Sequence, residues 1–212
     1  MKSAPSILLV LSAFGLLAAP SPALAEVGPD AASSEPPDQE PPTEARVGGL
    51  ELNVLWPLIP GVGIYQGRGT VKLWEVSGLH GDLVLSANIR PPLDRENEGS
   101  FSEYGGGLGY RQYFWRGLHV EVASYPSYAR LEDNVVDGDT YESFALTLEA
   151  YAGYRFLLSE LGLDDAKAWP LEPLVNVQVG AGGTAYLSNP WPTREEEPPV
   201  FFVGSVLIGA AF

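Results

Sequence analysis

The sequence predicts an all-β protein built as an antiparallel up-and-down transmembrane β-barrel of eight strands. Residues 48–212 break into short segments in which polar and apolar residues alternate, separated by clusters of Pro, Gly, Asn or Asp. No window of about 18 residues in this region is apolar enough for a spanning helix. A chain that spans a membrane without helices must close its sheet, because lipid leaves backbone polar groups unsatisfied.

Residues 1–25 have the features of a cleaved secretory signal peptide. Lys2 gives a positive start, residues 7–19 form a short apolar run, and Ala23-Leu24-Ala25 places small residues where a signal peptidase reads the chain. The apolar run is shorter than the roughly 20 residues that a spanning helix needs. We therefore expect export and cleavage after Ala25. The sequence contains no cysteine, so we expect neither lipid attachment at the cleavage site nor disulfides.

Residues 26–47 are predicted to form a disordered, acidic, Pro-rich periplasmic linker. This stretch has almost no large apolar side chain, so it buries too little surface to offset the entropy of ordering. A periplasmic docking arm is the alternative. The whole chain has a formal net charge of −15 at pH 7, which argues against nucleic acid as a partner because nucleic acids are held through their phosphates by Lys and Arg.

The predicted barrel occupies residues 48–212. If both termini are periplasmic, residues 115–117 form a tight periplasmic turn, and 158–170 form a longer periplasmic connection that could carry a short helix. The second strand is the hardest to assign, because residues 70–75 do not sort cleanly into two faces. The eight strand segments are 48–56, 69–76, 80–90, 101–115, 117–130, 140–157, 171–187 and 199–212, and the external loops are 57–68, 91–100, 131–139 and 188–198.

The alternation gives each segment one apolar face. Leu118, Val120 and Val122, for example, oppose His119 and Glu121. The same pattern fits a soluble sandwich, so the membrane assignment depends on the export signal, the end of the last strand and the aromatic residues. The aromatics expected at the two membrane interfaces are Trp56, Trp74, Tyr110, Tyr113, Phe114, Trp115, Tyr154 and Phe156.

The polar faces predict a charged barrel interior. An eight-stranded barrel is just wide enough for its own side chains, and buried charges are costly unless they are paired. We therefore expect an ionic plug, with a narrow polar channel or ligand cleft as the alternative. The predicted members are Glu51, Lys72, Asp82, Arg90, Glu103, Arg111, Glu121, Glu149 and Arg155.

The last segment follows one apolar register and ends on an aromatic residue. The residues of this register are Phe202, Val206, Ile208, Ala210 and Phe212. The pattern resembles the C-terminal strand signal by which outer-membrane barrels are recognised for assembly. Together with the export signal, the strand count and the alternation, residues 48–212 resemble the superfamily of small outer-membrane barrels that includes the OmpA transmembrane domain, OmpX, OmpW and the lipid A deacylase PagL. The resemblance implies location in a Gram-negative outer membrane, with membrane lipids, lipopolysaccharide and the assembly machinery as partners.

The leading functional expectation is a non-enzymatic integral outer-membrane protein with a structural or interaction role, and with no cofactor or metal ion. The first alternative is a narrow channel or a hydrophobic-ligand conduit of the OmpW kind. An acyl hydrolase similar to PagL would use His119 and Glu121. PagL carries a Ser two positions after its His, whereas Glu121 stands there in this chain and Ser124 falls on the opposite strand face. A soluble exported sandwich is the last alternative.

Overall fold

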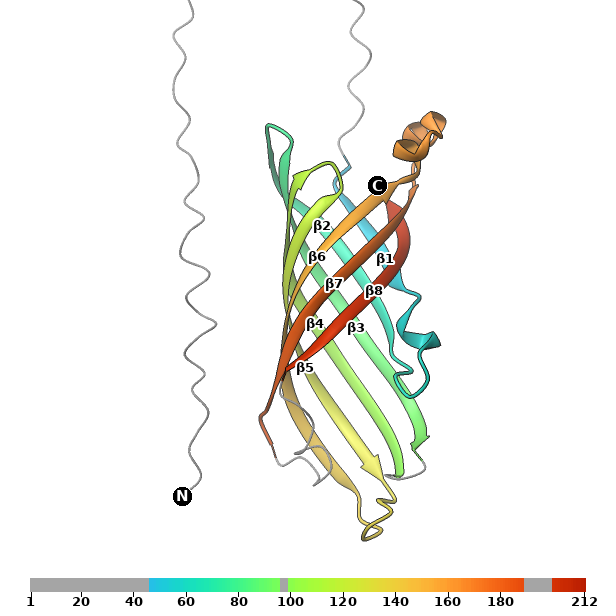
Figure 1. Ribbon diagram of the computed structural model, residues 1–212, viewed down its shortest axis with the longest axis vertical. Helices are drawn as coiled ribbons and strands as arrows, with labels where there is room; N and C mark the ends of the chain where they lie inside the picture. Colours follow the sequence, from blue (N-terminus) through green and yellow to red (C-terminus); the bar gives the residue numbers. More distant parts are fainter. Residues whose placement is uncertain (1–45, 96–98, 189–199) are drawn as a thin grey trace, which may run out of the picture. The chain divides into compact units, whose positions relative to one another are not determined.

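The structure is a computed structural model that describes residues 46–95, 99–188 and 200–212. The predicted signal peptide and residues 26–45 of the predicted linker lie outside the described residues. The described chain is one closed barrel of eight antiparallel strands (Figure 1). The strands are β1 (Gly48–Asn53), β2 (Tyr65–Val76), β3 (Leu79–Arg95), β4 (Gly99–Trp115), β5 (Leu118–Glu132), β6 (Tyr141–Leu157), β7 (Glu172–Tyr186) and β8 (Val200–Ala211).

Each strand pairs with the next one in the sequence, and β8 pairs with β1 to close the ring. The prediction of an eight-stranded, antiparallel, up-and-down barrel is therefore confirmed. The other elements are three short 3-10 helices, η3 (Trp56–Leu58), η4 (Leu158–Leu161) and η5 (Asp164–Ala168). The last two lie in the connection where a short helix was expected. Among the described residues there is no helix with the length and apolar character needed to cross a membrane.

The barrel has two distinct ends. The end that holds Gly48 and Ala211, with the turn at residues 116–117, is named here the terminal end. The opposite end holds the connections 54–64 and 133–140 and the first residues of β4 and β8, and is named the loop end. Strands β3 to β7 are the long ones, and β4 and β5 reach further toward the loop end than β8 does (Figure 1).

Side chains are distributed inside out relative to a soluble protein. On β5 the apolar residues Leu118, Val120 and Val122 are exposed, while His119 and Glu121 between them are buried. This follows from the two-residue period of a strand, which sends successive side chains to opposite faces of the sheet. Along this part of β5 the polar side chains therefore face the barrel interior, whereas nearer the loop end Ala129 and Leu131 form a buried apolar cluster with Phe101.

Two aromatic residues do not lie where the sequence predicted. Trp56 was expected on an outward girdle at the end of a strand, but β1 ends at Asn53 and Trp56 is buried in η3. Its indole Nε1 donates to the main-chain oxygen of Gly204 at 2.7 Å. Tyr113 was also expected outside, but it faces inward and is fully buried. Its ring stacks on His80, with 4.1 Å between centroids.

Strand β2 contains the irregularity that blurred its sequence pattern. It begins at Tyr65, four residues before the expected start, and its pairing with β3 shifts between Lys72 and Trp74. A bulge places two residues of one strand opposite one residue of its partner, so the alternation of faces changes at that point. The earlier start places Arg68 on β2, with its side chain inside the barrel.

Candidate functional site: an ionic plug inside the barrel

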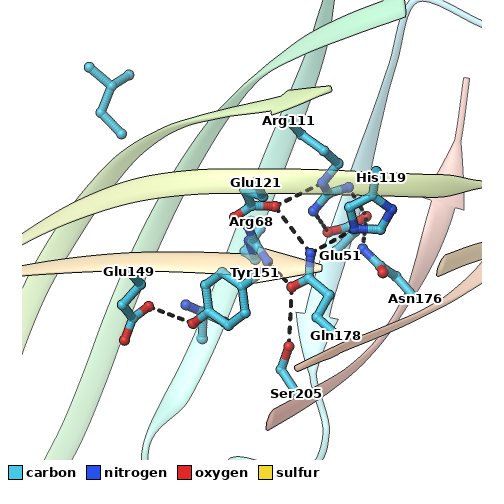
Figure 2. A network of polar contacts seen from close by, with 12 residues as sticks. Glu51, Arg68, Arg111, His119, Glu121, Glu149, Tyr151, Asn176, Gln178 and Ser205 are labelled. Atoms are coloured by element: carbon cyan, nitrogen blue, oxygen red, sulfur yellow. Dashed lines mark hydrogen bonds and ion pairs between the residues drawn. The ribbon is translucent and has the colours of Figure 1, made fainter. Parts of the chain in front are cut away.

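Four of the almost fully buried charges among the described residues meet inside the barrel. Glu51 comes from β1, Arg68 from β2, Arg111 from β4 and Glu121 from β5, and each is at most 3% exposed. They converge because each occupies an inward position of its strand. We name these four residues, with the polar side chains that bind them, the plug (Figure 2).

Arg111 is the centre of the plug. Its Nη1 and Nη2 donate to the two carboxylate oxygens of Glu51, at 2.8 and 2.9 Å, and its Nε donates to Glu121 Oε2 at 2.8 Å. Nη1 also lies 3.0 Å from the hydroxyl oxygen of Tyr113. A planar guanidinium that holds one carboxylate with two parallel bonds is fixed in orientation as well as in position.

Arg68 completes the charge balance. Its Nη2 pairs with Glu121 Oε1, and its Nη1 donates to Gln178 Oε1 at 2.9 Å. Two guanidinium groups therefore face two carboxylates, and the four charges sum to zero. Because an unpaired buried charge is strongly destabilising, this compensation is what allows the charges to remain in the barrel interior.

Neutral side chains from β7 and β8 connect the plug to the rest of the wall. Gln178 donates to Glu121 Oε2 at 3.1 Å and accepts a bond from the hydroxyl of Ser205 at 3.2 Å. Asn176 donates to Glu51 Oε1 at 3.3 Å. Figure 2 shows Gln178 between Glu121 and Ser205, so the network reaches from β5 across to β8. The plug thus contacts strands on all sides of the ring.

His119 takes part in this network through both ring nitrogens. Nδ1 lies 2.9 Å from the main-chain oxygen of Gly117, and Nε2 lies 3.0 Å from the amide nitrogen of Gln178. This pattern corresponds to a neutral imidazole that donates from Nδ1 and accepts at Nε2. Among the described residues, no Ser or Thr hydroxyl hydrogen-bonds to His119, and His119 is 1% exposed. The two catalytic candidates, His119 and Glu121, both have their polar atoms engaged inside the plug.

The predicted interior charges divide into several groups rather than one. Glu51, Arg111 and Glu121 are brought together in the plug. Toward the loop end, Arg90 pairs with Glu103 at 3.3 Å. Glu149 accepts a bond from the hydroxyl of Tyr151, and Figure 2 shows this pair to one side of the plug. Toward the terminal end, Arg155 lies 3.8 Å from Asp82, and Lys72 pairs with the exposed Glu75 at 2.6 Å.

Sequence reasoning missed several members of the plug. Arg68 was assigned to a loop because the start of β2 was placed at residue 69. The neutral members carry no charge signal, but Asn176 and Gln178 lie on the polar face of an alternating segment, and that position was available from the sequence. The missed members of the plug are Arg68, His119, Asn176, Gln178 and Ser205.

A cavity lies on each side of the plug. The loop-end cavity has a volume of about 410 Å³ and is lined by residues that include Trp56, Arg90 and Glu149. The terminal-end cavity has a volume of about 520 Å³ and is lined by residues that include Lys72, Asp82 and Arg155. No plug carboxylate or guanidinium lines either cavity. The plug therefore separates two vestibules.

Within the part of the chain that the structure describes, no group of three or more His, Cys, Asp or Glu side chains is arranged to hold a metal ion. The chain finds no match among models of protein families, among curated proteins or among solved structures. The fold and the plug together define the class: a closed, eight-stranded antiparallel barrel whose interior holds a network of buried ion pairs.

Proposed function

We propose that this protein is an integral outer-membrane β-barrel with a structural or interaction role, whose interior is closed by the plug. The observation that carries the proposal is the inside-out distribution of side chains. Leu85, Leu108 and Phe202 are 51%, 55% and 92% exposed, whereas Arg111 and Glu121 are 0% and 1% exposed. A soluble monomer seldom exposes a contiguous apolar surface larger than a few hundred Å². Hydrocarbon is the solvent that suits such a surface.

Exposed aromatic residues near the strand ends support a membrane orientation. At the loop end, Tyr65 of β2 and Tyr104 of β4 both pair with Ile89 of β3, so they form one continuous row. At the terminal end, Phe114 and Trp115 are exposed where β4 ends. Aromatic rings at two levels of a barrel match the headgroup regions on either side of a bilayer.

Subcellular fractionation tests the location. Expressed with its own N-terminal region in a Gram-negative host, the protein should sediment with outer membranes and resist extraction by carbonate. Recovery in the soluble periplasm after gentle lysis would contradict the proposal. Under the same proposal the outward register of β8 contacts the assembly machinery during insertion and lipopolysaccharide afterwards. Replacing outward Ile208 by Asp should therefore reduce the amount of assembled barrel.

Single-channel recording tests the closed interior. In planar bilayers the unmodified protein should give no steady open current, because the plug spans the lumen between the two vestibules. A variant that lacks the central side chains, Arg111→Ala with Glu51→Ala and Glu121→Ala, should give larger or more frequent current steps. A steady current through the unmodified protein would instead favour the narrow channel.

A further inference from the structure

The loop-end cavity reaches the barrel wall where β1 stops. β1 ends at Asn53, and its pairing with β8 covers only residues 49–53 and 207–211. β8 begins at Val200, so its residues 200–206 extend past the end of β1 and do not pair with it. Beside them lies the 54–64 connection. Among the described residues, Val54 N bonds Val206 O at 2.9 Å and the Trp56 indole bonds Gly204 O.

Beyond Gly204, β8 keeps its pairing with β7, and no described strand pairs with it on the side of β1. The residues that line the cavity on this side are Trp56, Ile59, Val62 and Ile64 from the connection and Phe201, Phe202, Val203 and Gly204 from β8. Phe202 lies on the outward face of β8 and is 92% exposed, while Glu149 and Arg90 lie on inward faces of β6 and β3. The cavity therefore extends from the inward side chains of Glu149 and Arg90 to the wall at β8, beside the outward-facing Phe202.

The two sides of this cavity differ in chemistry. The wall side is apolar, as its lining residues show. The far side carries acceptors: Asn88 Oδ1, which has no hydrogen-bond partner in the described chain, and the carboxylates of Glu103 and Glu149. One guanidinium, that of Arg90, lines the same cavity and pairs with Glu103 at 3.3 Å, while Glu149 accepts a bond from Tyr151. The far side therefore favours a group that donates hydrogen bonds and carries no negative charge.

We propose that the loop-end cavity is a lateral binding site for a single-tailed membrane amphiphile. The head of this molecule is uncharged or cationic, donates hydrogen bonds and lies in the lumen. Its alkyl tail leaves through the gap between β8 and the 54–64 connection. The occupant is amphiphilic because the gap side is apolar and opens beside Phe202, whereas the lumen side is polar. A volume of about 410 Å³ is in the range of small-molecule sites. This inference rests on the proposed membrane location, since the gap supplies a tail only if lipid surrounds it.

Photo-crosslinking of the full chain in vesicles of dioleoylphosphatidylcholine tests the site. Three dodecyl probes carry the same diazirine in the tail and differ in the head: a primary amine, a maltoside and a sulfate. Crosslinks mapped by mass spectrometry should concentrate on Ile59, Ile64 and Phe201 for the amine and the maltoside. Relative to crosslinks at lipid-facing Leu85, the sulfate should label these residues about tenfold less, the ratio expected from one charge-assisted hydrogen bond.

A pair of Trp variants provides the matched control. Val203→Trp adds bulk on the inward face beside the gap, and should remove most labelling of Ile59 and Ile64. Val179→Trp adds the same bulk on the outward face of β7, at the residue that pairs with Gly204, and should leave the labelling unchanged. Both variants must first insert into vesicles, as judged by flotation.

Each outcome decides between the two proposals. Equal labelling of Ile59 and Leu85, or labelling that persists in Val203→Trp, would overturn the lateral site while leaving the membrane location intact. Preference for the sulfate probe would overturn the assignment of the head group. Failure of the unmodified chain to float with vesicles would overturn the proposed function itself.

Discussion

At the scale of single residues, the plug depends most on Arg111. Arg111→Met removes the guanidinium that holds both Glu51 and Glu121, and leaves two buried carboxylates with only Arg68 as a cation in the plug. Breaking a buried ion pair by removing one partner costs about 3–5 kcal/mol. We expect a loss of that order in the free energy of unfolding, measured by urea titration of the protein in lipid vesicles.

The control for this prediction is an exposed pair of the same chemistry. Arg130 lies 2.8 Å from Glu132, and both side chains are 46% exposed. Arg130→Met should change the free energy of unfolding by no more than about 1 kcal/mol, because water screens the pair. Equal effects of the two substitutions would show that the plug does not stabilise the barrel. Adding Glu51→Gln to Arg111→Met should recover part of the loss, because the uncompensated carboxylate is then gone.

Alanine substitutions at two adjacent glycines of β4 should have different effects on stability. A methyl group on Gly107 would point inward, into Ser86 Oγ and to within 2.5 Å of Tyr125 Cδ1, whereas one on Gly106 would have Ser86 O at 3.6 Å as its nearest neighbour. Gly107→Ala should therefore cost about 1–3 kcal/mol of unfolding free energy through overpacking. Gly106→Ala should stay within about 0.5 kcal/mol of the unmodified protein. Similar values for both, in the same urea titration, would contradict this account of the interior packing.

At the scale of elements, the sequence predicted strands best where the alternation was unbroken. β5 and β6 were located to within two residues at each end, because a half-buried strand in a barrel requires a strict period of two. β2 was placed wrongly at its start because glycines at 67 and 69 carry no polarity signal and the bulge near Lys72 reverses the faces. Its error propagated directly into the site, since Arg68 was lost with it.

The aromatic errors have a different origin. Trp56 and Tyr113 have both an apolar ring and a polar atom, so they suit an interface and an interior equally well. Tertiary contacts decide between these places: Gly204 O accepts the Trp56 indole, and the His80 ring stacks on the Tyr113 ring. These partners are far away in the sequence, so the local pattern contains no information about them.

The 54–64 connection follows the short strand β1, and the side chain of Asn53, the last residue of β1, fixes its first turn. Asn53 Oδ1 accepts bonds from Leu55 N at 3.1 Å and Trp56 N at 3.2 Å. Asn53→Ala removes these side-chain-to-backbone hydrogen bonds, and a bond of this type is worth about 1 kcal/mol. Hydrogen exchange at the amides of Leu55 and Trp56 should therefore accelerate about fivefold.

A second Asn gives the matched control for this prediction. Asn134 Oδ1 accepts a bond from Val136 N at 2.9 Å in the separate connection 133–140. Asn134→Ala should accelerate exchange at Val136 and leave Leu55 and Trp56 unchanged. If Asn53→Ala left exchange at Trp56 unaltered, the contact with Gly204 alone would account for the position of the connection.

At the scale of the whole molecule, the proposed membrane location gives the two faces of the barrel wall different solvents, while the plug lies between two vestibules. The inward charges are stable only because they are mutually paired, and the outward apolar residues are stable only where water is excluded. Membrane burial therefore predicts that a charge on the outer wall is costly in proportion to its depth, whereas a soluble barrel would tolerate it at any height.

This depth dependence can be measured with one pair of substitutions. Leu85 lies near the middle of β3 and is 51% exposed, while Val135 lies in the 133–140 connection and is 57% exposed. Leu85→Arg should cost about 2–4 kcal/mol of unfolding free energy in lipid vesicles, the range for a lipid-facing Arg at the bilayer midplane. Val135→Arg should change it by less than about 0.5 kcal/mol, as is usual for a surface site in water. Because the side chains of Leu85 and Val135 are similarly accessible, the expected difference comes mainly from the surrounding solvent. Equal costs would place Leu85 in water.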